Sequence, residues 1–286
     1  MATFTNQATL AYRGGVVNSN IVTGEIPETL ILTKDALSAV YAPGGDVIYV
    51  VNIVNSGDRA FNALTLSDDL GAYEFGTGTV TPLTYTEGSL SYYVNGVLQP
   101  ATSLTVTQPL TVSGLFVPAN SVGTLVYRAA VNEFAPLGEG GEIVNTVTLS
   151  GGGLATPLTD SATVSVGSDP RLDITKAIAP ATVGPDGQVT YTLTILNYGN
   201  VATVAADDVI VSDTFDPTLD PISVTYNGEA WTAGVDYTYN STTGEFASAP
   251  GAVVVPAATY TQDPVSGAWG ITPGQAVIIV NGTING

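Results

Sequence analysis

The chain contains no cysteine and no histidine among its 286 residues. Disulfide bonds, thiolate catalysis, Ser-His-Asp triads and zinc sites with the usual ligands are therefore excluded. Basic residues are also few: six Lys and Arg stand against 25 Asp and Glu, which gives a formal net charge of −19. Nucleic acids and anionic membranes need a basic footprint on their partner, so neither is expected to bind. No cofactor or metal site is predicted.

Long apolar runs are missing too. No stretch approaches the roughly 20 apolar residues that cross a bilayer, so membrane insertion is not expected. Residues 1–23 do not begin with a basic stretch followed by a continuous apolar block, and so do not look like a secretion signal. Either a leader has been removed or the protein leaves its cell without one, and the sequence leaves both routes open.

The residues that are abundant favour β-structure. Short runs rich in valine, threonine and tyrosine alternate with Gly, Pro, Asn and Asp, and no segment shows a helical apolar period. This pattern predicts an all-β sandwich protein. At 286 residues the chain is long enough for two domains that each bury a core.

A repeat defines the two domains. Residues Leu30–Lys34 recur as Leu172–Lys176, at an offset of 142. The same offset relates three further pairs: Val47 and Val189, Tyr49 and Tyr191, Asn55 and Asn197. We therefore predict one domain over residues 27–168 and a second over residues 169–286.

The two copies do not end alike. The first closes with a hairpin-like segment, residues 143–166, whereas the second reaches residue 286 before any equivalent of it. A segment that resembles residues 143–166 lies at the N-terminus instead. The connection that follows it also matches, since residues 20–30 correspond to residues 162–172 at the offset of 142. We predict that residues 1–26 are a donor-strand segment that completes the second, incomplete domain of another copy. Its inward face would carry Phe4, Ala8, Leu10 and Tyr12.

Donation between identical chains predicts a polymer. A head-to-tail contact that does not close on itself generates an open fibre. An unfinished sandwich also exposes an apolar cleft and an unpaired strand edge, which favour a partner strand. Closure of the segment onto its own second domain is the alternative.

Polar residues on inward strand faces form two matching sets. The only lysines, Lys34 and Lys176, alternate with apolar residues, as do two aspartates and two asparagines. The first set is Lys34, Asp68 and Asn145, and the second is Lys176, Asp213 and Asn6. Burial away from water lowers the pKa of a lysine and raises that of an aspartate. The neutral amine is a nucleophile, and the protonated carboxyl can act as an acid/base.

Each set could form a Lys–Asn isopeptide bond with loss of ammonia. Lys34 would join Asn145 within one domain, and Lys176 would join Asn6 of a neighbouring copy, with Asp68 and Asp213 as acid/base. A buried ion pair beside a hydrogen-bonded asparagine is the alternative. Asn55 and Asn197 are competing acceptors, but both precede a glycine two residues later and look like turn residues.

At these residues the chain resembles the bacterial surface-repeat family called domain of unknown function eleven. The matching motifs are Thr175-Lys176, Gly184–Gly187, Tyr191–Gly199, Ser212-Asp213 and Asn6–Thr9, with the first domain carrying its own series through Asn145–Thr148. The resemblance implies immunoglobulin-like β-sandwiches in cell-surface, fimbrial or spore-surface proteins, and relatives that form isopeptide crosslinks. The chain departs from the family in having no cell-wall sorting motif.

The expected function is that of a structural subunit of an extracellular filament, a pilus, fimbria or spore appendage, on a bacterial cell or spore. Its partner would be itself, together with an unidentified surface anchor or tip protein. It is not expected to be an enzyme beyond single-turnover crosslinking. The alternative is an adhesin or surface-layer stalk module that binds a different protein or a glycan. Weaker hypotheses are a calcium site among the aspartates of residues 207–220 and sugar binding at Trp231 or Trp269.

Overall fold

The computed structural model describes residues 2–26, 29–185 and 187–284 and confirms the all-β fold class. Within these ranges the only helical elements are two short 3-10 turns, η1 (Ala101–Ser103) and η2 (Ala205–Asp207). The described residues contain no helix long and apolar enough to cross a membrane. The chain divides into two compact units, unit 1 with residues 1–136 and 142–165, and unit 2 with residues 137–141 and 166–286.

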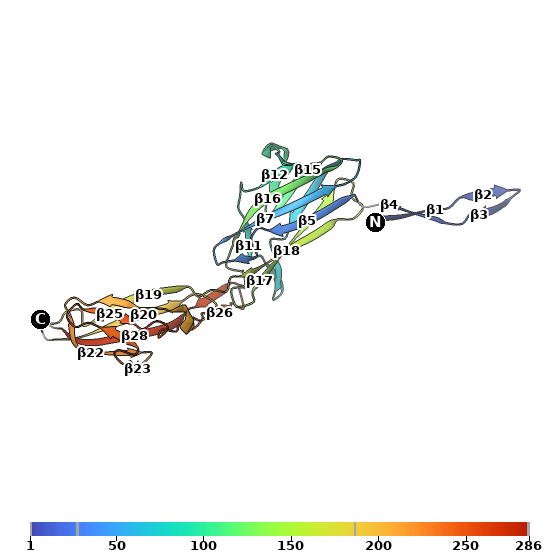
Figure 1. Cartoon of the computed structure of the whole chain (residues 1–286). Helices are drawn as coiled ribbons and strands as arrows, with labels where there is room; N and C mark the ends of the chain where they lie inside the picture. Colours follow the sequence, from blue (N-terminus) through green and yellow to red (C-terminus); the bar gives the residue numbers. More distant parts are fainter. Residues whose placement is uncertain (1, 27–28, 186, 285–286) are drawn as a thin grey trace. The chain divides into compact units, whose positions relative to one another are not determined.

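Unit 1 holds a sandwich of two six-stranded sheets (Figure 1). The first sheet has the order β13 (Val97–Leu98), β12 (Ser91–Val94), β16 (Ser121–Val131), β7 (Asp46–Asn55), β5 (Leu30–Ala36), with β11 (Leu83–Tyr85) beside β16. The second has the order β14 (Thr105–Thr107), β15 (Thr111–Val117), β8 (Phe61–Asp68), β17 (Glu142–Gly151), β18 (Leu158–Val166), β6 (Val40–Tyr41). A small pair, β9 (Tyr73–Phe75) and β10 (Gly78–Val80), lies apart from them.

Alternation along the strands explains this sandwich. In β7 and β16 every second side chain is buried, and the two strands pair antiparallel with Tyr49 opposite Tyr127. In the second sheet β17 lies between β8 and β18, with Val147 opposite both Asp68 and Asp160. Because apolar residues occupy the inward positions, the two sheets share one core. Strand β17 is thus an interior strand of unit 1.

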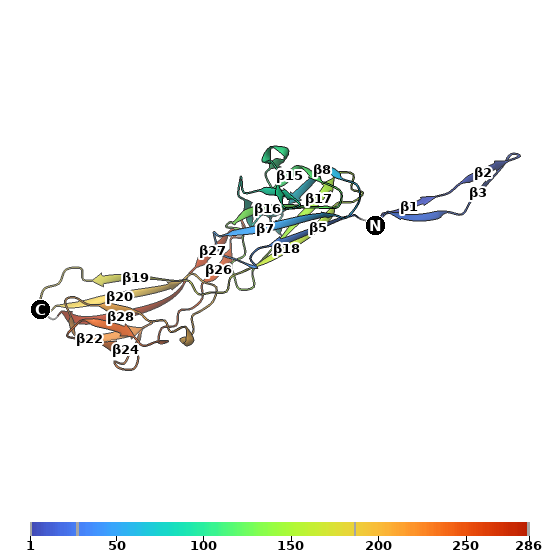
Figure 2. The same cartoon turned by 45° about the horizontal axis from the view of Figure 1, so that its top comes forward.

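Unit 2 has one large sheet and two small ones. The large sheet has the order β19 (Leu172–Ala179), β20 (Gln188–Asn197), β28 (Gly274–Ile284), β22 (Leu219–Tyr226), β23 (Glu229–Ala230). The small sheets are β21 (Ser212–Thr214), β25 (Glu245–Ser248), β24 (Tyr237–Tyr239), and the pair β26 (Thr259–Gln262), β27 (Trp269–Thr272). Figure 2 shows β19, β20, β28 and β22 side by side. The core of unit 2 is built around Phe215, Phe246 and Ile278, which are all buried.

The N-terminal hairpin, residues 2–26, forms two consecutive two-stranded ladders. The outer ends of the hairpin pair as β1 (Ala2–Asn6) with β4 (Val22–Ile26), and the part next to the turn pairs as β2 (Thr9–Tyr12) with β3 (Gly15–Asn18). The turn at Arg13-Gly14 has both residues at positive φ, as tight hairpin turns require. These ladders pair with no other sheet among the described residues.

The unit boundary differs slightly from the predicted domain boundary. The chain passes from unit 1 to unit 2 between Ser165 and Val166, whereas the predicted boundary lies between residues 168 and 169. Residues 137–141, a loop within the first sequence copy, group with unit 2. The repeat could not predict this grouping, because the loop precedes β17 and has no counterpart in the second copy.

Candidate crosslinking sites and strand-acceptor face

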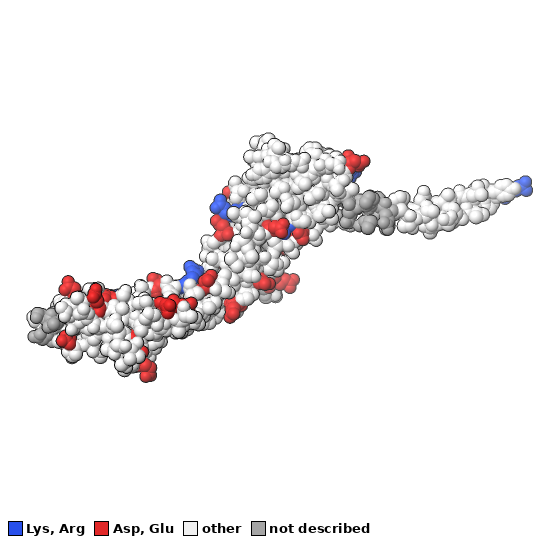
Figure 3. All heavy atoms as spheres, in the orientation of Figure 1, with Lys and Arg blue, Asp and Glu red and all other residues white. Residues whose placement is uncertain are grey.

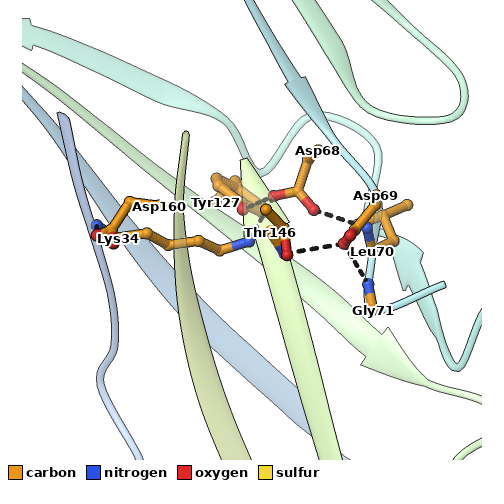
Figure 4. Close-up of polar contacts among 8 residues, drawn as sticks. All are labelled: Lys34, Asp68, Asp69, Leu70, Gly71, Tyr127, Thr146 and Asp160. Atoms are coloured by element: carbon orange, nitrogen blue, oxygen red, sulfur yellow. Dashed lines mark hydrogen bonds and ion pairs between the residues drawn. The ribbon is translucent and has the colours of Figure 1, made fainter. Parts of the chain in front are cut away.

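Unit 1 brings Lys34 and Asp68 together inside the sandwich (Figure 4). Lys34 comes from β5 in the first sheet and Asp68 ends β8 in the second sheet. The Lys34 Nζ lies 3.0 Å from Asp68 Oδ2, and both side chains are fully inaccessible to solvent. The ammonium also lies 4.6 Å from the centre of the Tyr49 ring. A buried charge pair of this kind is costly unless further groups satisfy it.

Three hydrogen-bond donors hold the carboxylates around this pair. The Tyr127 hydroxyl donates to Asp68 Oδ2, and the backbone N–H of Leu70 donates to Asp68 Oδ1 at 2.7 Å. On the other side, the backbone N–H of Lys34 donates to Asp160 Oδ2 at 2.7 Å (Figure 4). Asp160 lies on β18, so its side chain ties the edge strand β5 to the second sheet. The pair is therefore fixed from both sheets.

Asn145 of β17 completes the predicted set in unit 1. It is fully buried, and its carboxamide nitrogen and oxygen make no hydrogen bond of normal geometry with any described residue. Burial raises the pKa of both Tyr49 and Tyr127, and the nearby Asn145 carboxamide partly offsets that rise. Asn145 and Lys34 thus have Tyr49 as a common neighbour. A buried amide without partners is costly, which suits a group that reacts rather than one that only packs.

Electrostatics at Lys34 favour a nucleophile. Burial lowers the pKa of Lys34 to about 8, although the carboxylates of Asp68, Asp69 and Asp160 oppose this shift. A lysine with such a pKa has a substantial neutral fraction near neutral pH, and only the neutral amine attacks a carbonyl carbon. Unit 1 therefore buries an activatable amine, a carboxyl group and an amide around the shared neighbour Tyr49.

Unit 2 contains the same ion pair in an open setting. Lys176 of β19 and Asp213 of β21 approach to 2.5 Å, but their side chains are 40% and 16% exposed. The ammonium again lies over aromatic rings, 4.6 Å from the centre of Tyr191 and 5.2 Å from that of Phe215. Register places Val280 opposite Tyr191, where unit 1 has Tyr127 opposite Tyr49. The second aspartate therefore has no equivalent of the Tyr127 hydroxyl.

The face of unit 2 around this pair is uncovered. Leu30 and Leu32 of β5 are 3% and 8% exposed, whereas their repeat equivalents Leu172 and Ile174 are 42% and 49% exposed. Every residue of β19 is exposed. A hollow of about 470 Å³ opens beside β21, lined by Ser212, Asp213, Thr214, Thr238, Glu245, Phe246 and Ala247.

One edge of β21 is also unpaired. β21 pairs with β25 on one side, as β8 pairs with β15 in unit 1. On its other side, where β8 pairs with β17, no strand of the described ranges pairs with β21. β21 has only 3 residues, while β8, which is paired on both sides, has 8. Unit 2 thus offers both a free strand edge and an apolar face.

Asn6, the asparagine predicted for the second set, lies in the N-terminal hairpin. It pairs with Val22 across the ladder and is exposed to solvent. The other predicted donor residues are exposed as well, with Phe4 54%, Leu10 67% and Tyr12 66% accessible and Ala8 open to solvent. The structure therefore pairs Lys34 with Asp68 in unit 1 and Lys176 with Asp213 in unit 2. Asn145 is buried beside Tyr49, which also contacts Lys34.

The two competing asparagines are turn residues. The Asn55 side chain donates to the carbonyls of Arg59 and Pro118 at 2.8 and 2.7 Å, and it accepts from the Gly57 N–H. Asn197 makes the equivalent bonds to the carbonyls of Val201 and Pro256 and accepts from the Gly199 N–H. Because every polar atom of these side chains is used, they hold loops and leave no amide free for the lysines.

Sequence reasoning missed Tyr49, Tyr127 and Asp160 as members of the unit 1 site. Tyr49 carried a signal, since it recurs as Tyr191 at the repeat offset and alternates with buried residues. Tyr127 carried none, because its position holds Val280 in the second copy and only the strand register pairs the two. Asp160 acts through the backbone of Lys34, a contact that no sequence pattern encodes.

Comparison with known proteins gives structural likeness only. No family model and no curated protein sequence matches the chain. Among solved structures, the major pilin subunit of Bacillus cereus is 12% identical with a TM-score of 0.37, over 94% of this chain and 73% of that one. The pilus backbone protein of Streptococcus pneumoniae is 12% identical with a TM-score of 0.35, over 86% and 55%. The collagen adhesin of S. aureus is 15% identical with a TM-score of 0.31, over 53% and 55%.

Proposed function

We propose that the protein is a structural subunit of a filament on a bacterial surface and polymerises by strand donation. The N-terminal hairpin of one copy fills the uncovered face of unit 2 in the next copy. The observation that supports this proposal is the contrast between β5 and β8, covered and paired by β17 and β18, and β19 and β21, which lack such strands among the described residues. Each added subunit offers a new free face, so growth is open-ended.

The register of the donated strand follows from unit 1. There β17 pairs with β8 so that Val147 lies opposite Asp68 and Leu149 opposite Leu66. Asn6–Leu10 matches Asn145–Leu149, and Asp213 matches Asp68. In the filament Ala8 therefore lies opposite Asp213, and Leu10 lies opposite Val211 of the neighbouring copy. In this proposed register Asn6 approaches the Lys176–Asp213 pair, and the support for it is that Asn145 and Lys34 share Tyr49 as a neighbour in unit 1.

Apolar burial favours the joint between the N-terminal hairpin of one copy and unit 2 of the next. Docking covers large side chains on both partners, namely Phe4, Leu10, Tyr12, Leu172, Ile174 and Ile178, all now exposed. Each is worth roughly 1.5–3 kcal/mol when fully buried, so the joint gains on the order of 10 kcal/mol before ordering costs.

Charge poses little obstacle at the hairpin. Arg13 is the only charged residue among residues 4–24, so all of the acidic excess behind the formal charge of −19 lies outside this segment. Figure 3 shows acidic groups over both units and a single basic group at the hairpin tip. A donor whose residues 4–24 contain no acidic group avoids the repulsion that two acidic surfaces would feel.

We propose one isopeptide-forming reaction for both sets of residues, first within unit 1 and then between copies. The neutral amine of Lys34 attacks the side-chain carbonyl carbon of Asn145, and the new C–N bond forms as the bond to the asparagine nitrogen breaks. Asp68 carries one proton from the lysine nitrogen to the leaving nitrogen, which departs as ammonia. Lys176, Asp213 and the neighbouring copy's Asn6 repeat the step after docking buries them. Because Lys176 is exposed beforehand, the inter-subunit bond follows assembly and does not precede it.

Assembly of the purified chain tests the proposal. The full chain is expected to form fibres by itself, seen by negative-stain electron microscopy and by sedimentation. A chain that begins at residue 29 is expected to stay monomeric, and, when mixed in, to shorten the fibres because it accepts a hairpin but cannot donate one. A full chain that remains monomeric at all concentrations contradicts strand donation between copies. It would favour an adhesin or stalk module whose unit 2 face receives a different protein.

A further inference from the structure

Strand donation requires the N-terminal hairpin to fit a space that β17 and β18 fill in unit 1. At the inner face of that pair, Ile143 of β17 lies opposite Val164 of β18, and both side chains are buried. The next inward pair is Asn145 opposite Ala162. Whatever replaces these residues in unit 2 of a neighbouring copy must present a similar shape, because cores are close-packed.

The free hairpin already presents a different pair at this position. Phe4 is the residue that matches Ile143, and its cross-strand partner is Gly24. The repeat offset of 142 would have put Val22 in the place of Val164, but the ladder pairs Val22 with Asn6. Strand β4 is thus displaced by two residues along β1 from the position that the repeat offset predicts.

Geometry shows why glycine stands opposite Phe4. A Cβ atom on residue 24 would lie 2.4 Å from Cζ and 2.6 Å from Cε1 of the Phe4 ring. The far edge of the Phe4 ring therefore occupies the space that a side chain at position 24 would fill. Real Cβ atoms do not approach ring carbons this closely, so any larger residue must displace the ring.

We infer that Phe4 and Gly24 form a composite plug that replaces the Ile143–Val164 pair in the unit 2 cavity of the next copy. The two pairs have the same number of side-chain carbon atoms, so they fill similar volumes in different shapes. A plug preformed in the free hairpin needs no reordering when it docks, which lowers the entropic cost of binding. This inference rests on the proposed function and names the pair that decides the fit of the partner hairpin.

The plug predicts a compensation pattern. Gly24→Val alone pushes the ring away and is expected to reduce assembly at least about tenfold, within the range expected for overpacking. Phe4→Ile alone leaves a void over Gly24 and weakens assembly to a smaller degree. The double variant Phe4→Ile/Gly24→Val recreates the Ile143–Val164 pair and is expected to restore assembly to within about threefold of the wild type, since volume-conserving swaps are tolerated.

The experiment measures, for full-length chains, the fraction that sediments at a fixed time over a range of concentrations. Thr23→Val is the matched control. Thr23 is exposed, and because successive residues of a strand face opposite sides, its side chain lies on the face away from the Phe4 ring. Thermal unfolding of each variant checks that units 1 and 2 are intact.

Each outcome has one meaning. Loss in Gly24→Val, recovery in the double variant and an unaffected control support the plug. A double variant no better than Gly24→Val, or a control that fails equally, overturns it. A wild-type chain that does not assemble contradicts strand donation itself, whereas wild-type fibres with an unaffected Gly24→Val contradict only the plug.

Discussion

β5 and β19 are equivalent strands of the repeat with opposite surroundings. In β5, Leu30, Leu32 and Lys34 are buried beneath the second sheet. In β19, the equivalent Leu172, Ile174 and Lys176 are open to solvent. The strands themselves do not explain this difference, because each is the edge of its own sheet. The difference comes from β17 and β18, which cover β5 and have no counterpart in unit 2 of the described chain. Equivalent positions of the repeat are core in unit 1 and exposed in unit 2.

The comparison is sharpest at the lysines, where the largest effect is expected. If Lys176 is joined to Asn6 of the next copy as proposed, wild-type fibres should give a ladder of covalent multimers on a denaturing gel. Lys176→Ala should abolish the ladder. Lys34→Ala should leave it in place, since that lysine serves only the bond within unit 1. A ladder that persists without Lys176 would contradict the assignment.

Equivalent leucine and isoleucine positions should differ in their effect on stability. Leu32→Ala is expected to lower the free energy of unfolding of unit 1 by about 2–5 kcal/mol, because it leaves a cavity in the core. Ile174→Ala should cost less than about 1 kcal/mol in a chain without residues 1–26, since that side chain is 49% exposed. Denaturant unfolding of both variants measures the difference. Equal losses would mean that the β19 face is already covered in the monomer.

The pH dependence of unit 1 tests whether the internal bond exists. A free Lys34 has a folded pKa of about 8 against an ordinary value of 10.5. Below pH 8 both states carry the proton, and between pH 8 and 10.5 the unfolded state holds more protons, so stability rises with pH. In Asn145→Ala, which cannot form the bond, the unfolding free energy should increase by about 1 kcal/mol from pH 7 to 9.

Wild-type protein provides the contrast. An amide nitrogen does not titrate in this range, so the bonded wild type should show no such rise. Measurements stop at pH 9 because tyrosines of the unfolded chain ionise at about pH 10. The raised pKa values of buried tyrosines, such as Tyr49 and Tyr127, make that ionisation favour unfolding. A wild type with the same slope as Asn145→Ala would show that the pair is an ordinary buried ion pair.

The smallest expected effect concerns Tyr127, which unit 2 replaces with Val280. Tyr127→Phe removes the hydroxyl bond to Asp68 and should lower the unfolding free energy of unit 1 by about 1–3 kcal/mol. Val280→Phe, which also introduces a ring without a hydroxyl, is a comparison at the equivalent place in unit 2. Mass spectrometry of unit 1 peptides would show whether Lys34 still joins Asn145. An unchanged stability in Tyr127→Phe would mean that the hydroxyl has no role at Asp68.

Much of the fold was predictable from periodicity. Alternation gave the inward direction of Lys34, Asp68 and Asn145, and all three are buried. Tertiary contacts were beyond the sequence, because direction along a strand says nothing about what lies across the cavity. Tyr127 and Asp160 belong to the site through register and a backbone contact. The Phe4–Gly24 pairing likewise depends on a two-residue shift in the hairpin that the repeat offset does not contain.

The most direct test of strand donation uses the absence of cysteine. In unit 1, Thr148 of β17 lies opposite Ser67 of β8, and the matching residues are Thr9 and Ser212. Two single variants, Thr9→Cys and Ser212→Cys, are mixed and oxidised under assembly conditions. Antiparallel neighbours lie about 4.5–5.5 Å apart at Cα, within the reach of a disulfide. Strand donation predicts a mixed disulfide between the two chains. It predicts little disulfide when the acceptor is Val254→Cys, because Val254 is exposed but lies outside β21. Fibres that form without the Thr9–Ser212 disulfide would contradict it.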